Sequence, residues 1–147
     1  MSEIVYQYVG EKKERSSKFC CRWLEESEHE VFCRHLELCE QKPVSKAVWK
    51  EIWQEEIEYA GLFIDDKMVA RACIERYSED YWEVADVRVV KAFRNRGYAY
   101  EICLFVMNKI IEQGKIPTIR TEETNEAIKQ VKQVIRKLGF IEICVGK

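Results

Sequence analysis

The stretch from Trp82 to Gly114 limits the fold more than any other, because it predicts a strand, a turn and a helix in direct succession. Residues 82–90 are rich in β-branched side chains, and residues 91–97 form a basic loop that contains one glycine. Apolar side chains then recur three or four positions apart over residues 98–113. Gly114 suits the end of this helix, because glycine readily adopts the left-handed backbone of a C-terminal cap.

The junction between this strand and helix is predicted to bind an anion. The first turn of a helix leaves its N–H groups unpaired, and the helix dipole adds partial positive charge there. Gly97 can take a positive φ and lets a ligand approach the backbone closely. Arg94 and Arg96 add planar, fork-shaped donors that match phosphate oxygens. This part of the sequence therefore predicts a pyrophosphate site.

Two blocks of sequence carry a resemblance to a known family. Residues 94–99 read Arg-x-x-Gly-x-Ala after Val-x-Val at residues 87–89, which resembles the acetyl-CoA-binding motif of the GCN5-related N-acetyltransferases, the GNAT family. Residues 124–127, followed by Leu-Gly-Phe at residues 138–140, resemble that family's second helix and the next strand. The resemblance implies an α/β (α+β) GNAT fold, in which helices flank a central mixed, mostly antiparallel sheet whose two central parallel strands splay apart.

By the same resemblance the chain uses acetyl-CoA as its co-substrate and needs no metal. The family's pantetheine arm bonds to the backbone of the strand before the phosphate loop, here at Val87 and Val89, whose side chains are expected in the core. Asn125 is a candidate to hydrogen-bond cofactor or substrate, and its plainer role is to cap the helix that it opens. The pyrophosphate would lie on the loop and first helical turn formed by Arg94, Asn95, Arg96, Gly97, Tyr98 and Ala99.

Glu83 is the preferred general base. It lies eleven residues before Arg94, the spacing at which histone-type members of the family carry their catalytic glutamate. Its parity on the strand matches Val87 and Val89, which predicts partial desolvation and a raised pKa. The alternative is an ordinary glutamate at a solvated strand entrance. Asp86 is the second candidate, on the opposite face unless a bulge resets the alternation.

The implied reaction is acetyl transfer to a primary amine of a small molecule or peptide, by direct attack on the thioester in a ternary complex. Many family members place a tyrosine five residues before the phenylalanine of the Gly-Phe pair, where it protonates the leaving thiolate. Ile135 stands at that position here, and Tyr98 or Tyr100 could take over its role. The departure supports an alternative hypothesis, a catalytically weak or inactive domain that binds acyl-CoA as a sensor or interaction module.

Length and charge narrow the class of protein. The 147 residues are enough for one domain, 1–147, to bury a core without disulfides or metal. A formal charge of -2, with acidic and basic residues well mixed, argues against nucleic-acid binding. Charged residues interrupt the longest apolar run, and the first residues lack the layout of a signal peptide. The sequence thus predicts a cytoplasmic protein that does not enter a membrane.

Seven cysteines are predicted to be reduced thiols, because their number is odd and their spacing shows no pairs. A zinc site built on Cys33, His35 and Cys39 is the alternative. Residues 33 and 35 would point away from each other on a helix, and the chain has no Cys-x-x-Cys pair, so the reduced reading is preferred.

The remaining elements follow from hydrophobic spacing. The pattern predicts a strand at 3–9, a helix over 27–40, and a second helix capped by Ser45, whose Trp49 and Trp53 are expected to pack in the core. A hairpin is expected at 60–64 and 68–74, and a strand at 116–121 parallel to the strand at 82–90. Apolar residues at helical spacing predict a helix over 127–138, and a strand is expected at 140–145.

Family members usually end in a two-strand hairpin after the Gly-Phe pair. Only seven residues follow Phe140 here, so the second strand is expected to be missing, replaced by another element, or supplied by a partner chain. An unpaired strand edge needs covering, and a homodimer is one way to cover it.

Overall fold

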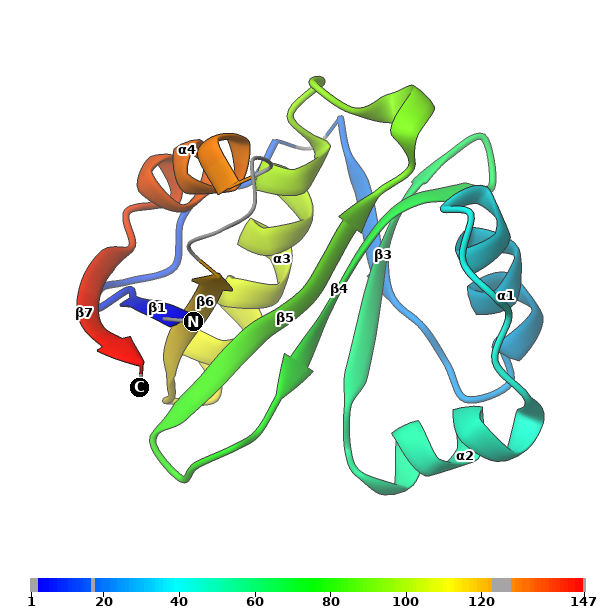
Figure 1. Ribbon diagram of the computed structural model, residues 1–147, viewed down its shortest axis with the longest axis horizontal. Helices are drawn as coiled ribbons and strands as arrows, with labels where there is room; N and C mark the ends of the chain where they lie inside the picture. The colour runs from blue at the N-terminus through cyan, green and yellow to red at the C-terminus, as the bar shows by residue number, and fades with distance from the viewer. Residues whose placement is uncertain (1–2, 17, 123–127, 147) are drawn as a thin grey trace.

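A computed structural model describes residues 3–16, 18–122 and 128–146, apart from the side chains of residues 122, 128–130 and 144–146. Its described strands form one seven-stranded sheet in the order β2-β3-β4-β5-β6-β1-β7, flanked by four α-helices (Figure 1). Neighbouring strands are antiparallel except for β5 and β6, which are parallel. The expected mixed, mostly antiparallel sheet is therefore confirmed. The elements are β1 (Glu3–Gln7), β2 (Cys20–Trp23), α1 (His29–Leu38), α2 (Lys46–Gln54), β3 (Glu58–Ile64), β4 (Lys67–Glu75), β5 (Tyr81–Val89), a 3₁₀ turn (Lys91–Phe93), α3 (Tyr98–Glu112), β6 (Ile116–Glu122), α4 (Ile128–Leu138) and β7 (Ile141–Gly146).

Helices α3 and α4 share one hydrophobic core with the sheet. Ile102, Val106 and Ile110 of α3 are completely buried against strands β3 to β6, as the spacing of apolar residues predicts. Leu138 of α4 joins the same cluster. The helix α3 ends at Glu112, and Gly114, just after the C-cap, has a φ of 76°, the expected left-handed backbone. This packing fixes the start of α3 relative to the end of β5.

Helices α1 and α2 pack in a second cluster around Phe32, Trp49 and Met68. Ser45 caps α2 by accepting a hydrogen bond from the Val48 amide at 3.1 Å, as predicted. Trp49 is 4% exposed and donates its indole N–H to the Glu26 carbonyl at 2.7 Å. The core role expected for Trp49 is therefore confirmed. Among the described segments, no helix is long and apolar enough to cross a membrane.

The first strand of the chain lies far from the second. Strand β1 is inserted between β6 and β7 and pairs antiparallel with both, whereas β2 pairs with β3 at the opposite edge of the sheet. Strand β1 thus takes the place beside β7 in the way expected if another element of the same chain replaces the closing strand. The strand β2 was not predicted, because its four residues show too short a pattern.

A bulge in β5 changes which side chains face the core. Asp86 has a φ of 49°, and the pairing of β4 with β5 shifts register at this point. As a result Val84 and Val89 both join the α3 core although they are five positions apart. The shared parity expected for Glu83, Val87 and Val89 is therefore wrong. Val89 is buried as predicted, but Val87 is 38% exposed.

Candidate functional site

The loop after β5 has the backbone geometry that an anion site requires. Gly97 is the N-cap of α3 with a φ of 83°, and no atom lies within 4 Å of the position that a Cβ would take. Its carbonyl accepts the first helical hydrogen bond, from the Glu101 amide at 3.1 Å. No side chain caps this end among the described residues, so the N–H groups of the first turn are left without a capping acceptor there. The glycine expected at this junction thus has its predicted conformation.

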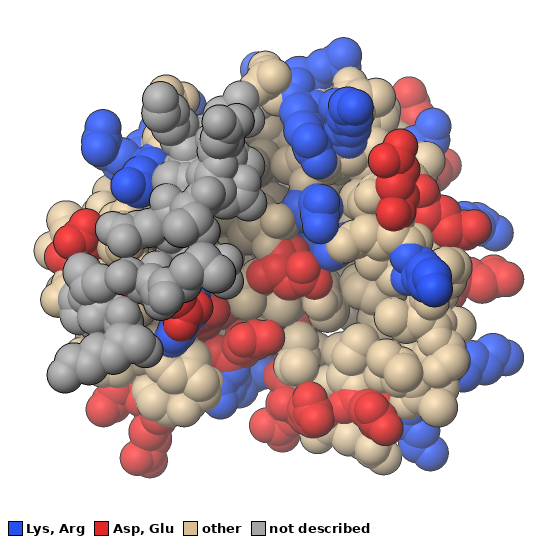
Figure 2. Space-filling model, in the orientation of Figure 1, with Lys and Arg blue, Asp and Glu red and all other residues tan. Residues whose placement is uncertain are grey.

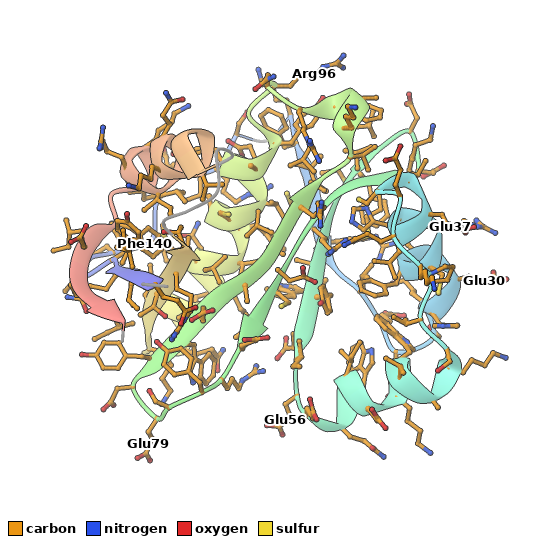
Figure 3. The ribbon with its side chains drawn as sticks, viewed as in Figure 1. Glu30, Glu37, Glu56, Glu79, Arg96 and Phe140 are labelled. Atoms are coloured by element: carbon orange, nitrogen blue, oxygen red, sulfur yellow. The ribbon has the colours of Figure 1, made fainter. Side chains whose placement is uncertain are left out.

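The basic residues of the loop take different positions. Arg94 folds back and donates from Nε to the Val89 carbonyl at 3.1 Å, which ties the loop to the end of β5. Arg96 points outward at the top of the molecule, and its guanidinium lies 5.6 Å from the Phe93 ring centroid (Figure 3). Asn95 has a φ of 63°, which tightens the turn before Gly97. Arg96 is therefore placed to reach an anion, whereas Arg94 also supports the loop.

Strands β5 and β6 separate toward this loop. Their parallel pairing covers only residues 81–83 and 116–118, although β5 continues to Val89 and β6 to Glu122. Residues 84–89 of β5 have a strand partner only on the β4 side within the described part of the chain. The splay expected of the central parallel strands is confirmed, and it leaves backbone groups of β5 open to an extended ligand. Ala99 and Tyr98 follow in the first turn of α3.

Glu83 lies at the point where the two strands separate. It is 7% exposed and its Oε1 accepts a hydrogen bond from Nε of Arg120 at 2.5 Å. Burial raises the pKa of Glu83, and the hydrogen bond and charge of Arg120 oppose that rise. Glu83 is thus a buried carboxylate paired with Arg120, and the alternative of an ordinary glutamate at a solvated strand entrance does not describe it.

Arg120 and Tyr77 were not identified from the sequence, because a single basic or aromatic residue carries no spacing signal. Arg120 also lies 3.8 Å from Glu3, and its guanidinium is 5.3 Å from the Tyr77 ring centroid. The Tyr77 hydroxyl and Thr118 Oγ1 share a hydrogen bond of 2.7 Å. The face of the molecule in Figure 2 shows acidic and basic side chains around a hollow near its middle.

A second polar network holds the bulge of β5. Arg71 is only 2% exposed and binds the Asp86 carboxylate twice, with Nε to Oδ2 at 3.1 Å and Nη2 to Oδ1 at 3.0 Å. Tyr59 donates its hydroxyl to Asp86 Oδ2 at 2.6 Å, and Arg71 donates to Gln41 Oε1 at 2.9 Å. Asp86 is therefore engaged in an ion pair that stabilises its strained backbone, which makes it a weaker candidate base than Glu83.

We expect Asp86→Ala to destabilise the fold by about 2 kcal/mol, because it leaves the buried Arg71 without its counter-ion and Asp86 is itself only partly buried. Asp66→Ala is the matched control, since Asp66 also has a positive φ, 65°, but lies in an exposed turn. Urea unfolding of both variants measures the difference. Equal losses of stability would assign the effect to backbone strain and exclude the ion pair.

The described cysteines form no disulfides with one another. Cys20, Cys21, Cys33, Cys39, Cys73 and Cys103 are all free, and the side chain of Cys144 lies outside the description. Burial raises the pKa of Cys73 and Cys103, and it raises the pKa of Cys21 to about 11. His29 lies 3.3 Å from Cys33 Sγ, but the described residues contain no group of three side chains suited to a metal.

We expect thiol titration of the denatured protein to find seven reactive thiols. In the native protein the exposed Cys20 should react first, and the buried Cys73 and Cys103 should react slowest, because neither forms thiolate readily. Stoichiometric zinc by elemental analysis, or fewer than seven thiols without reductant, would contradict this assignment.

The candidates for a general acid lie in different surroundings. Ile135, at the position of the family's tyrosine, is 2% exposed and belongs to the core. The Tyr98 ring packs against Phe19 and Phe93, with centroids 5.8 and 6.4 Å away. The ammonium of Lys137 lies over the Tyr100 ring, 4.5 Å from its centroid. Asn125, predicted to bind cofactor or substrate, lies outside the described residues.

Comparison with known proteins identifies the family. Residues 59–146, more than half of the chain, match the family described as FR47-like protein. The chain belongs to this FR47-like family of the GNAT group. No curated protein matches the FR47-like chain.

Solved structures of acetyltransferases share the fold of the FR47-like chain. A GNAT-family protein from Novosphingobium aromaticivorans aligns with 98% of this chain at 18% identity and a TM-score of 0.76, and the chain spans 60% of that protein. A ribosomal-protein-alanine N-acetyltransferase from Brucella melitensis aligns with 79% at 15% identity and a TM-score of 0.62, with 90% of that protein covered. An aminoglycoside acetyltransferase from a soil metagenomic sample aligns with 82% at 15% identity and a TM-score of 0.66, with 87% covered.

Proposed function

We propose that the FR47-like chain transfers an acetyl group from acetyl-CoA to a primary amine. The observation that carries this proposal is the side of β5 beyond Glu83, which pairs with no strand in the described part of the chain and leads to the loop before α3. An extended thioester could lie along this edge with its pyrophosphate on the open first turn of the helix. The family membership supports the same assignment.

The residues present suit two parts of acetyl-CoA, the pyrophosphate and the pantetheine arm. The open space at Gly97 and the outward guanidinium of Arg96 suit a pyrophosphate, and Tyr98 and Ala99 supply first-turn N–H groups. Val87, whose side chain is exposed, and Val89 would bond the pantetheine through their backbone groups alone. Asn125 stays a predicted contact of the cofactor or substrate. No step in this scheme calls for a metal.

Glu83 would act as the base that prepares the amine. An ammonium group must lose a proton before it attacks, and a carboxylate with a raised pKa accepts that proton better than an exposed one. The neutral amine then forms a C–N bond at the thioester carbonyl, and a strand N–H of β5 stabilises the oxyanion. The C–S bond breaks, and coenzyme A leaves as a thiolate or thiol. Arg120 would keep the Glu83 carboxylate oriented through Oε1.

The acceptor is proposed to be a small amine or a peptide. Solved structures of similar fold include enzymes named for aminoglycosides and for the alanine of a ribosomal protein, which are examples of both classes. Release of free coenzyme A thiol should be measured with acetyl-CoA and a panel of polyamines, aminoglycosides and peptides with free N-termini. Acceptor-dependent release with at least one class is expected. Release that does not depend on any acceptor would contradict an amine acetyltransferase.

A non-catalytic acyl-CoA sensor is the second candidate, and the burial of Ile135 is the observation that favours it. In that case acetyl-CoA binds with a measurable Kd, but no amine in the panel accelerates thiol release. Both functions therefore predict binding of acetyl-CoA, and only the enzyme predicts amine-dependent release of coenzyme A.

A further inference from the structure

The connection between β1 and β2 crosses the outer side of α3. These strands lie near opposite ends of the sheet, and the described residues 8–16 of the connection pass beside the helix, with Lys13 and Arg15 in contact with it. Asn108 of α3 fixes this connection at Lys13, where its amide oxygen accepts from the backbone N–H at 3.0 Å and its amide nitrogen donates to the carbonyl at 2.8 Å. The crossing segment is thus held firmly beside the helix.

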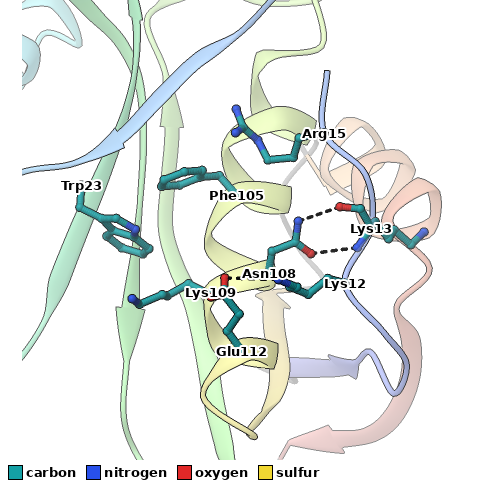
Figure 4. Close-up of a pocket in the computed structure, with 8 residues that line it drawn as sticks. All are labelled: Lys12, Lys13, Arg15, Trp23, Phe105, Asn108, Lys109 and Glu112. Carbon is teal, nitrogen blue, oxygen red and sulfur yellow. Dashed lines mark hydrogen bonds and ion pairs between the residues drawn. The ribbon is translucent and has the colours of Figure 1, made fainter. Parts of the chain in front are cut away.

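A pocket of about 400 Å³ lies between this segment, α3 and β2 (Figure 4). This volume falls within the usual range for small-molecule sites, roughly 300 to 1,000 Å³. Its walls combine basic side chains with two aromatic rings. The lining residues are Lys12, Lys13, Arg15, Trp23, Phe105, Asn108, Lys109 and Glu112.

The aromatic wall of the pocket is preorganised. The rings of Trp23 and Phe105 are in contact, with centroids 5.3 Å apart, and both are partly exposed. The guanidinium of Arg15 lies 4.9 Å from the centroid of Phe105. A flat aromatic ligand could pack against this wall without first ordering it.

The charges of the pocket favour an anion. It has four cationic side chains and one carboxylate, Glu112, which lies 3.8 Å from Lys12. Lys109 points from α3 toward Trp23 (Figure 4). Arg15 donates from one terminal nitrogen to the Phe19 carbonyl at 3.2 Å, while its buried Nε has no hydrogen-bond partner in the described structure. Basic side chains thus outnumber acidic ones in the lining of the pocket by four to one.

We propose that this pocket binds a small aromatic anion, one or two fused rings that carry a carboxylate or a phosphate. The ring packs on Trp23 and Phe105, and the anionic group pairs with Lys109. The pocket lies beside the second half of α3, about 10 to 20 Å along the helix axis from its N-terminus. It is therefore separate from the loop proposed for acetyl-CoA.

Calorimetric titration with indole-3-acetate and with adenosine monophosphate tests the proposal on the full chain. We expect saturable binding of at least one probe, and roughly tenfold weaker binding of indole-3-acetamide and acetate, which lack the charge or the ring. Lys109→Gln should weaken the anion roughly tenfold, and Lys50→Gln, an exposed lysine of α2, should have no effect. No saturable binding up to millimolar concentrations would overturn the proposal.

Competition separates this pocket from the acetyl-CoA site. The aromatic anion should bind equally well in the presence of saturating acetyl-CoA, and Gly97→Glu should leave its affinity unchanged. Displacement by acetyl-CoA would mean that the ligand occupies the nucleotide end of the cofactor site, and would overturn the assignment. Because these readouts require only binding, failure of the acetyltransferase proposal would not alter them.

Discussion

Replacing Gly97 by glutamate should lower the affinity for acetyl-CoA by about 100-fold or more, which corresponds to about 2.7 kcal/mol. The new side chain would enter the open space at the start of α3, where the pyrophosphate is proposed to lie. Its negative charge would repel the phosphates and compete for the same N–H groups. The φ of 83° would also strain any residue with a Cβ. Calorimetry with acetyl-CoA measures the change.

Gly114→Glu is the matched control for this substitution. Gly114 has a φ of 76°, open space around its Cβ position, and lies at the other end of the same helix. Both variants should therefore lose similar stability in urea unfolding, and only Gly97→Glu should lose acetyl-CoA binding. Equal affinities in the two variants would remove the phosphate loop from the proposed cofactor site.

Glu83→Gln should lower turnover by roughly 10²- to 10⁴-fold, the usual contribution of a positioned base. Affinity for acetyl-CoA should stay within a few fold of wild type, because the proposed cofactor contacts lie on Val87, Val89 and the loop. Glutamine keeps the size of the side chain and can still accept a hydrogen bond from Arg120. Steady-state kinetics with the acceptor identified in the panel, together with calorimetry, separates these effects.

The pH profile gives an independent test of the same base. Glu83 must be ionised to accept a proton, so the wild-type rate should rise with pH through an apparent pKa above that of an unperturbed glutamate, about 4.3. The variant Glu83→Gln should lose this rise. Arg120→Gln should move it to higher pH, because the hydrogen bond from Arg120 lowers the pKa of Glu83.

Glu79→Gln serves as the control for the loss of a carboxylate, since Glu79 lies on the exposed turn before β5 and points away from the molecule (Figure 3). It should keep wild-type turnover and pH dependence. If Glu83→Gln behaves like this control, Glu83 has only a structural role, and Asp86 or a water relay becomes the next candidate for the base.

The sequence predicted the local parts of the candidate site well. The glycine turn, the start of α3 and its buried stripe depend on residues close together in the chain, so their pattern is visible in one segment. The parallel pairing of β5 and β6 also followed, because a helical crossover of this length joins parallel strands. These features decide where an anion could bind.

Features that depend on distant residues could not be predicted in the same way. The bulge at Asp86 is held by Arg71 and Tyr59, which lie on other strands, so strict alternation placed Val87 in the core when it is exposed. Arg120 meets Glu83 only because β5 and β6 are neighbours. A strand was expected at residues 3–9 and is found at Glu3–Gln7, but alternation alone does not specify which strands it pairs with.

The position of β1 affects the order in which the protein can fold during synthesis. Glu3 pairs with Glu122 on one side and with Gly146 on the other, so β1 can complete its pairing only after the chain has been made as far as these two partners. Contacts of such high sequence separation slow folding, and until they form β6 keeps an edge open to pairing with other chains. The nascent chain would therefore carry β1 unpaired while the residues between β1 and β6 are made, and this interval is the stage most exposed to aggregation and to chaperone binding.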